Sequence, residues 1–135
     1  MATFVDEAGR SWSIRIDVAA IRKVRTKRGV DLAKVMGSQE ELQKLLDDPC
    51  LWVDVLWDLV EEQANTQGVT AEAFAHGLAG DSFEAANNAL IEAIIDFFPS
   101  SRREILRRLL SKVKEMETLS LENMSQQIDS LTFGS

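Results

Sequence analysis

The chain carries few of the side chains that enzymes use for chemistry. Its 135 residues include one histidine, His76, one cysteine, Cys50, and no tyrosine. Cys50 lies at the predicted start of a helix, where the helix dipole favours a nucleophilic thiolate, but Asp47 and Asp48 oppose it. His76 has no cysteine or second histidine nearby with which to bind zinc. We therefore expect no catalytic residue, no cofactor and no metal site.

Three acidic residues, Asp54, Asp58 and Glu61, share one face of a predicted helix. Carboxylate oxygens are ligands of divalent cations, so such a face has the chemistry of a metal site. The outer face of an amphipathic helix in an acidic protein shows the same pattern, and nothing in the sequence resembles a calcium-binding loop. We interpret the three carboxylates as an ordinary polar face.

Basic residues form a stripe on the helix predicted to follow Pro99. Its members are Arg102, Arg103, Arg107, Arg108, Lys112 and Lys114. Three interpretations stay open: salt bridges to the acidic middle of the chain, which we favour, docking of an acidic protein, and direct binding of DNA or RNA. The last is the weakest, because nucleic-acid-binding domains are usually basic and this chain has a net charge of −7.

The charge is unevenly distributed along the chain. Residues 1–28 carry a net charge of +4, residues 29–101 a net charge of −12, and residues 102–135 a net charge of +1. Either the acidic middle pairs with the basic ends, which we favour, or it forms a polar surface for a charged partner. The overall negative charge disfavours nonspecific binding to nucleic acid or to an anionic membrane.

Two apolar surfaces lie outside the predicted core. Val53 and Trp57 fall on the second face of the helix whose core stripe runs from Leu51 to Leu59. Trp57 is either covered by another element, which we favour, or an anchor for a partner. Beyond Thr118 a weaker apolar stripe continues. Its members are Leu121, Met124, Ile128 and Leu131. These two surfaces are the candidate protein-binding sites.

Hydrophobic periodicity and capping residues predict the elements that position these side chains. Residues 1–16 predict a β-hairpin with a turn at residues 6–10, in which Trp12 alternates with polar neighbours. Asp17 is the predicted N-cap of the first helix, and Gly29 ends that helix.

Further helix starts are marked by polar residues. Three predicted capping boxes, in which two side chains satisfy each other's backbone donors, begin at Ser38, Asp81 and Ser101. Asp48, followed by a proline, marks another start. Between the first helix and Ser38, residues 30–36 are a helical turn or a buried linker.

The predicted fold class is mostly α: a single compact bundle of five to seven short helices with an N-terminal β-hairpin. We expect a helical domain over residues 1–118 and a C-terminal tail over residues 119–135, helical or partly disordered. No apolar run approaches the roughly 20 residues that span a bilayer. With no visible export signal and a single cysteine, we expect a cytoplasmic protein without an internal disulfide.

The order of the segments resembles that of the tail assembly chaperones of long-tailed bacteriophages, over roughly residues 2–115. The segments that carry the resemblance include Trp12-Ser13-Ile14, Gly29-Val30-Asp31-Leu32, Gly68-Val69-Thr70, Leu78-Ala79-Gly80-Asp81 and Phe97-Phe98-Pro99. These chaperones are small, acidic and helical, and their genes precede that of the tape-measure protein in phage and prophage genomes.

The resemblance implies a non-enzymatic protein that acts in the cytoplasm of a bacterial host. Such a protein coats the helical tape-measure protein and is displaced as the tail tube polymerises. Family members are often made in two lengths by a programmed frameshift, and some self-associate into homo-oligomers. Two alternatives remain: a structural head–tail connector or other phage structural protein, and a small regulator that binds nucleic acid through the Arg102–Lys114 stripe.

Overall fold

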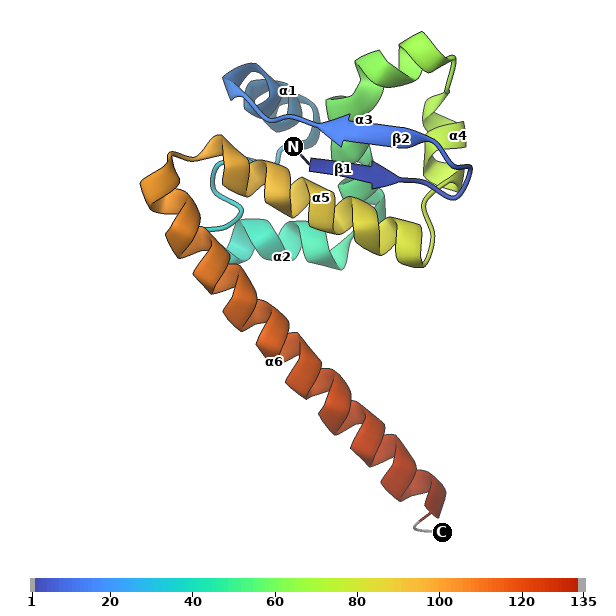
Figure 1. Cartoon of the computed structure of the whole chain (residues 1–135), viewed down its shortest axis with the longest axis vertical. Helices are drawn as coiled ribbons and strands as arrows, with labels where there is room; N and C mark the ends of the chain where they lie inside the picture. Colours follow the sequence, from blue (N-terminus) through green and yellow to red (C-terminus); the bar gives the residue numbers. More distant parts are fainter. Residues whose placement is uncertain (1, 134–135) are drawn as a thin grey trace. The chain divides into compact units, whose positions relative to one another are not determined.

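The computed structural model describes the backbone of residues 2–133 (Figure 1). It describes the side chains of residues 2–112, apart from residue 46, and of residues 115, 116, 119, 123 and 124. The elements are β1 (Ala2–Val5), β2 (Ser11–Ile14), α1 (Val18–Arg28), α2 (Gln39–Asp47), α3 (Pro49–Gln67), α4 (Ala71–His76), α5 (Asp81–Phe97) and α6 (Ser100–Phe133). The predicted mostly α fold with an N-terminal β-hairpin is confirmed, with six helices in the described part of the chain.

The chain divides into two units, Met1–Phe98 and Pro99–Ser135. The first unit therefore ends before residue 118, where the hydrophobic pattern places the domain boundary. The second unit holds α6, which runs as one continuous helix through Phe133. The predicted tail, residues 119–135, lies within this helix as far as Phe133.

The predicted hairpin is confirmed, with β1 antiparallel to β2 and Phe4 opposite Trp12. Side chains alternate along both strands, so Phe4, Trp12 and Ile14 are buried while Val5 is exposed. A two-stranded hairpin is marginal in water unless its apolar face is covered. Here β1 and β2 both contact α5, and β2 also contacts α3. The hairpin therefore belongs to the core of the first unit.

The first helix, α1, has the predicted caps. The Asp17 carboxylate accepts a hydrogen bond from the backbone N–H of Ala20 at 2.8 Å. Gly29 ends the helix in the left-handed region, with φ of 71°, which glycine adopts without a steric cost. Residues 30–36 then form a linker in which Val30, Leu32 and Val35 are buried. Two hydrogen-bonded turns lie within it, from the N–H of Lys34 to the Asp31 carbonyl and from the N–H of Gly37 to the Lys34 carbonyl, each at 3.0 Å.

Two of the three predicted capping boxes are wrong, and the third is half formed. Helix α5 begins at Asp81, after Gly80, and has no side-chain cap. Helix α6 begins before Ser101, because the Pro99 carbonyl accepts the N–H groups of residues 102 and 103. At α2, Ser38 accepts from the N–H of Glu41 at 3.4 Å. The Glu41 carboxylate accepts instead from the distant N–H of Asp31, also at 3.4 Å, so tertiary contacts compete with the local box.

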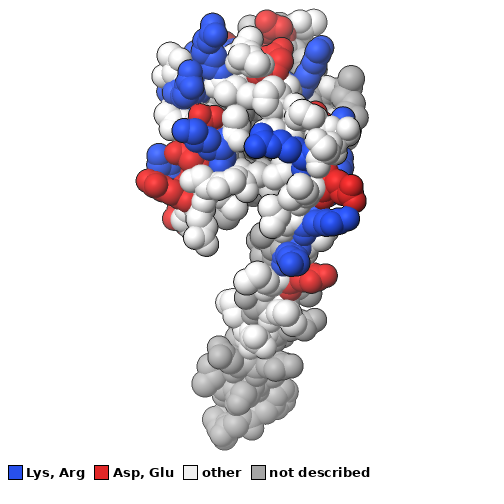
Figure 2. Space-filling view, turned by 90° about the vertical axis from the view of Figure 1, so that its left-hand side faces the viewer, with Lys and Arg blue, Asp and Glu red and all other residues white. Residues whose placement is uncertain are grey.

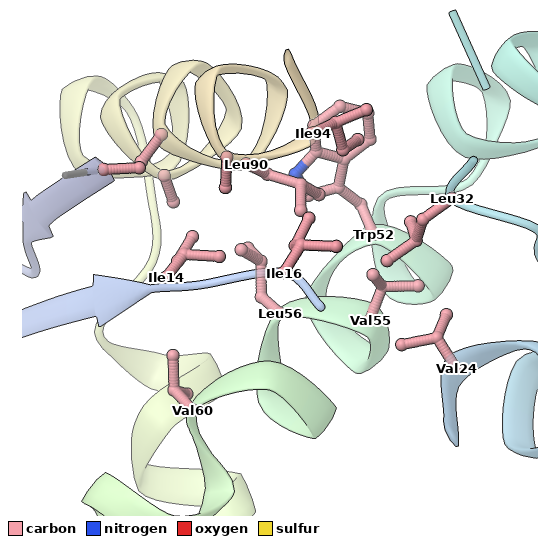
Figure 3. Close-up of a cluster of buried hydrophobic side chains, with 14 of the residues drawn as sticks. Ile14, Ile16, Val24, Leu32, Trp52, Val55, Leu56, Val60, Leu90 and Ile94 are labelled. Carbon is pink, nitrogen blue, oxygen red and sulfur yellow. The ribbon is translucent and has the colours of Figure 1, made fainter. Parts of the chain in front are cut away.

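Helix α3 lies at the centre of the first unit and contacts α1, α2, α4, α5 and β2. Asp48 caps it through the N–H of Leu51 at 3.2 Å, with a proline in its first turn as predicted. Gly68, with φ of 71°, ends it. Side chains from the hairpin, the segment after it, α1, the linker, α3 and α5 meet in the core (Figure 3). The labelled members are Ile14, Ile16, Val24, Leu32, Trp52, Val55, Leu56, Val60, Leu90 and Ile94. Within the part of the chain that the structure describes, no helix is both long and apolar enough to cross a membrane.

Candidate functional site

An apolar groove lies between the start of α3 and the segment that joins α4 to α5. Its volume is about 420 Å³. Val53 on α3, Leu78 in the connecting segment and Phe83 on α5 supply its larger apolar side chains, all three partly buried. The remaining lining residues are Pro49, Cys50, Asp54, Ala75, Ala79 and Gly80. Most of these residues are apolar, which is typical of a surface that binds an apolar ligand.

The segment between α4 and α5 is held by its own hydrogen bonds. The Ser82 hydroxyl accepts from the N–H of Ala79 at 3.0 Å and lies 3.1 Å from the Gly77 carbonyl, to which it can donate. Gly80 has a φ of 57°, which turns the chain into α5. These contacts fix the backbone on both sides of Leu78, so one wall of the groove has a defined position.

The C-terminal end of α4 is also joined to the hairpin turn, around a buried carboxylate. Asp6 accepts hydrogen bonds from the N–H of Arg10 at 2.9 Å, from its guanidinium Nε at 2.8 Å and from the indole N–H of Trp12 at 3.0 Å. Arg10 also donates from Nη2 to the Ala73 carbonyl at 3.1 Å, and the N–H of Glu7 donates to Gly77. The turn and α4 are therefore cross-linked around one charge.

Burial by itself raises the pKa of Asp6. Hydrogen bonds from Trp12 and from the backbone and side chain of Arg10, together with the guanidinium charge, more than offset that effect. The net pKa of Asp6 is below its ordinary value of 3.8, so the carboxylate stays ionised at neutral pH. Asp6 was not among the residues singled out from the sequence, because a single aspartate in a turn has an ordinary local role.

The two predicted partner-binding residues on α3 have different surroundings. Val53 lines the groove. Trp57, one turn later, packs on Phe74 of α4 with ring centroids 5.8 Å apart. Trp12 contacts the same phenylalanine from the hairpin, with centroids 5.1 Å apart and rings nearly perpendicular. Trp57 therefore contacts α4 and stays partly exposed, and of the two residues Val53 lines the groove. A role of Trp57 as an anchor for a partner stays a prediction.

The predicted tail stripe lies on α6. Met124 is exposed, while the side chains of Leu121, Ile128 and Leu131 lie outside the described residues. In the basic stripe, Arg103 is partly buried, and the exposed members are Arg102, Arg107, Arg108 and Lys112. Arg108 pairs with Glu104 one turn earlier at 2.7 Å. The side chain of Lys114 is also outside the described residues, and pairing of the stripe with the acidic middle stays a prediction.

The acidic face of α3 pairs with α1. Arg28 donates from Nε and Nη2 to the two oxygens of Asp58, each at 2.9 Å, and Nη1 lies 3.7 Å from Asp54. Lys23 donates to Glu61 at 3.1 Å. Basic and acidic side chains lie beside one another on the face drawn in Figure 2. The expectation that the acidic middle pairs with the basic N-terminal segment is thus confirmed for these side chains.

The histidine and the cysteine are both exposed and have different neighbours. His76 is exposed at the end of α4, with Nε2 3.7 Å from Glu72. Cys50 is exposed in the first turn of α3 and lines the groove. The sequence did not predict that Cys50, Leu78 and Phe83 would share a site, since they come from three segments. The one local signal was Val53, an apolar residue off the core stripe of its helix.

Comparison of the chain with protein-family models, with curated proteins and with solved structures finds no match.

Proposed function

We propose that the chain is a non-enzymatic assembly chaperone for the tail of a bacteriophage or prophage, and that it binds a helical segment of the tape-measure protein. The observation that carries this proposal is the groove formed by Val53, Leu78 and Phe83. A helix that places its apolar face in such a groove is a common mode of protein recognition. The order of segments, which resembles that of tail assembly chaperones, supplies the identity of the partner.

Co-purification with the downstream genes tests the proposal. The chain is expressed with an N-terminal tag in its natural gene context, and the bound proteins are identified by mass spectrometry. We expect recovery of a long helical downstream product, with or without a longer frameshifted form of the chain. Recovery of the chain alone would overturn the proposal.

A matched pair of variants locates the surface. Val53→Asn places an amide in the groove, whereas Val18→Asn makes the same change at the exposed start of α1. We expect the first variant to lose the partner and the second to retain it, at equal unfolding midpoints. Truncation after Thr118 tests the tail stripe in the same assay, and unchanged recovery would exclude that stripe.

The same gene context distinguishes the alternatives. A head–tail connector would remain in purified phage particles, where a chaperone is absent, so proteomics of the particles separates the two classes. A regulator acting through the Arg102–Lys114 stripe would bind DNA with an affinity that falls steeply as salt rises. Either result without tape-measure binding would replace the proposed function.

A further inference from the structure

The chemistry around the groove indicates which helices it accepts. The groove is built from α3, α4, the segment that follows α4, and α5. Residues 45–101, which include all of these elements, contain no lysine or arginine. A ligand in the groove therefore meets no lysine or arginine side chain from the elements that line it.

One acidic residue lines the groove and three more are next to lining residues in the chain; we call these four its acidic rim. Asp54 lines it directly, with half of its side chain exposed, and its only ion pair among the described side chains is the long contact to Arg28 at 3.7 Å. Asp48 precedes Pro49, and Asp81 and Glu84 follow Gly80 and Phe83; all three are exposed. An anionic ligand is repelled at this rim, while a cation on the ligand gains from it.

We infer that the groove binds the apolar face of an amphipathic helix of a partner protein, and that lysine or arginine residues flank this apolar face. This inference rests on the proposed function for the partner being another protein, and adds the charge that the partner must carry. Apolar contacts with Val53, Leu78 and Phe83 supply the affinity. The acidic rim supplies selectivity, because juxtaposed like charges oppose docking.

The chain contains a basic amphipathic helix of its own, α6, which is the main competing occupant. Its basic residues are partly compensated within the helix, as in the 2.7 Å pair of Arg108 with Glu104. A partner helix without such compensation matches the acidic rim better. The chain's own sequence is therefore included as a probe in the test.

The single cysteine provides a direct readout of occupancy. Cys50 is exposed and lines the groove, so a bound helix shields its thiol from an uncharged alkylating reagent such as iodoacetamide. The probes are peptides of roughly four helical turns, about 14 residues, added to the full-length chain. One has a leucine face flanked by lysines, a second has the same face flanked by glutamates, and a third is a scrambled leucine–lysine peptide.

We expect the leucine–lysine peptide to slow alkylation of Cys50 and to bind at least about tenfold more tightly than the leucine–glutamate peptide, a difference of about 1.4 kcal/mol. Its affinity falls as salt is raised. Val53→Asn weakens the protection, and Val18→Asn leaves it unchanged. Equal protection by the glutamate or scrambled peptide, or none by any peptide, would overturn the inference.

Two further outcomes separate this inference from the proposed function. If a peptide of residues 100–118 binds more tightly than the leucine–lysine peptide, the occupant is α6 and the assignment to a partner is wrong. If the leucine–lysine peptide protects Cys50 but no tape-measure protein co-purifies, the chemistry of the groove stands and the proposed function fails. If the tape-measure protein co-purifies without protecting Cys50, it binds elsewhere, and the inference fails alone.

Discussion

The indole N–H of Trp12 donates a hydrogen bond of 3.0 Å to Oδ2 of Asp6, and both side chains are inaccessible to solvent. The tryptophan ring at the same time packs edge-on against Phe74 of α4. One residue thus joins the buried charge of the hairpin turn to the aromatic cluster that supports α4. α4 leads directly into the wall of the groove. The contacts among Asp6, Trp12 and Phe74 therefore help to hold that wall in place.

Replacement of Asp6 by asparagine should lower the free energy of unfolding by about 2–3 kcal/mol at pH 7, because a buried, charge-assisted hydrogen-bond acceptor is lost. The folded pKa of Asp6 is below 3.8, so its stabilising contribution is complete above that pH and is lost as the pH falls through the folded value. The difference in free energy of unfolding between wild type and Asp6→Asn should therefore become smaller below about pH 4. Urea unfolding followed by tryptophan fluorescence measures it, and a constant difference down to pH 3 would contradict the assignment.

Gly77→Ala should lower the free energy of unfolding by about 1–3 kcal/mol, because the side chains of Asp6 and Arg10 already fill the space beside Gly77. A Cβ at Gly77 would lie 3.0 Å from Oδ2 of Asp6 and 3.1 Å from Nη2 of Arg10. The matched control is Gly37→Ala, where the nearest atom is the Lys34 carbonyl oxygen at 4.0 Å. Thermal unfolding compares the two variants, and equal midpoints would show that the contacts at Gly77 yield without cost.

Removal of the guanidinium in Arg28→Met should destabilise the chain by about 3 kcal/mol, because the buried Asp58 carboxylate loses its bidentate partner. The same change at Lys27, whose contact to Glu61 is 3.9 Å long and partly exposed, should lower the free energy of unfolding by less than about 1 kcal/mol. The double variant Arg28→Met, Asp58→Leu should recover much of the loss, since no unpaired charge remains buried. Chemical denaturation gives all three values, and a loss for Lys27→Met as large as that for Arg28→Met would refute the distinction.

The side chain of Gln63 should protect the outer edge of β2. Its amide accepts from the N–H of Ser13 at 3.0 Å and donates to the Ser13 carbonyl at 2.6 Å, so it satisfies the backbone groups that a third strand would otherwise pair. Gln63→Ala should lower the free energy of unfolding by about 1–2 kcal/mol. It should also speed hydrogen exchange of the Ser13 backbone amide. Gln67→Ala, at the exposed end of the same helix, is the control. Unchanged exchange at Ser13 in the Gln63 variant would contradict this role.

Local physics made the elements predictable. Alternation around Trp12, an aspartate cap at Asp17 and Asp48, and glycines at the ends of α1 and α3 act within one or two turns of chain. The structure confirms them at those positions. The predicted boxes at Asp81 and Ser101 failed although their residue types were correct, because Gly80 and Pro99 begin the helices earlier. Residue type alone does not decide between two adjacent start sites.

The sequence by itself determined the composition of the surfaces: few groups for catalysis, an acidic middle, and an apolar Val53 outside the core stripe of its helix. Only the tertiary structure decided which of these groups meet. It brings Arg28 to Asp58 and Val53 to Leu78 and Phe83, and it packs Trp57 against Phe74. These contacts join segments far apart in the chain, and they arise from burying several apolar faces at once, which no local pattern encodes.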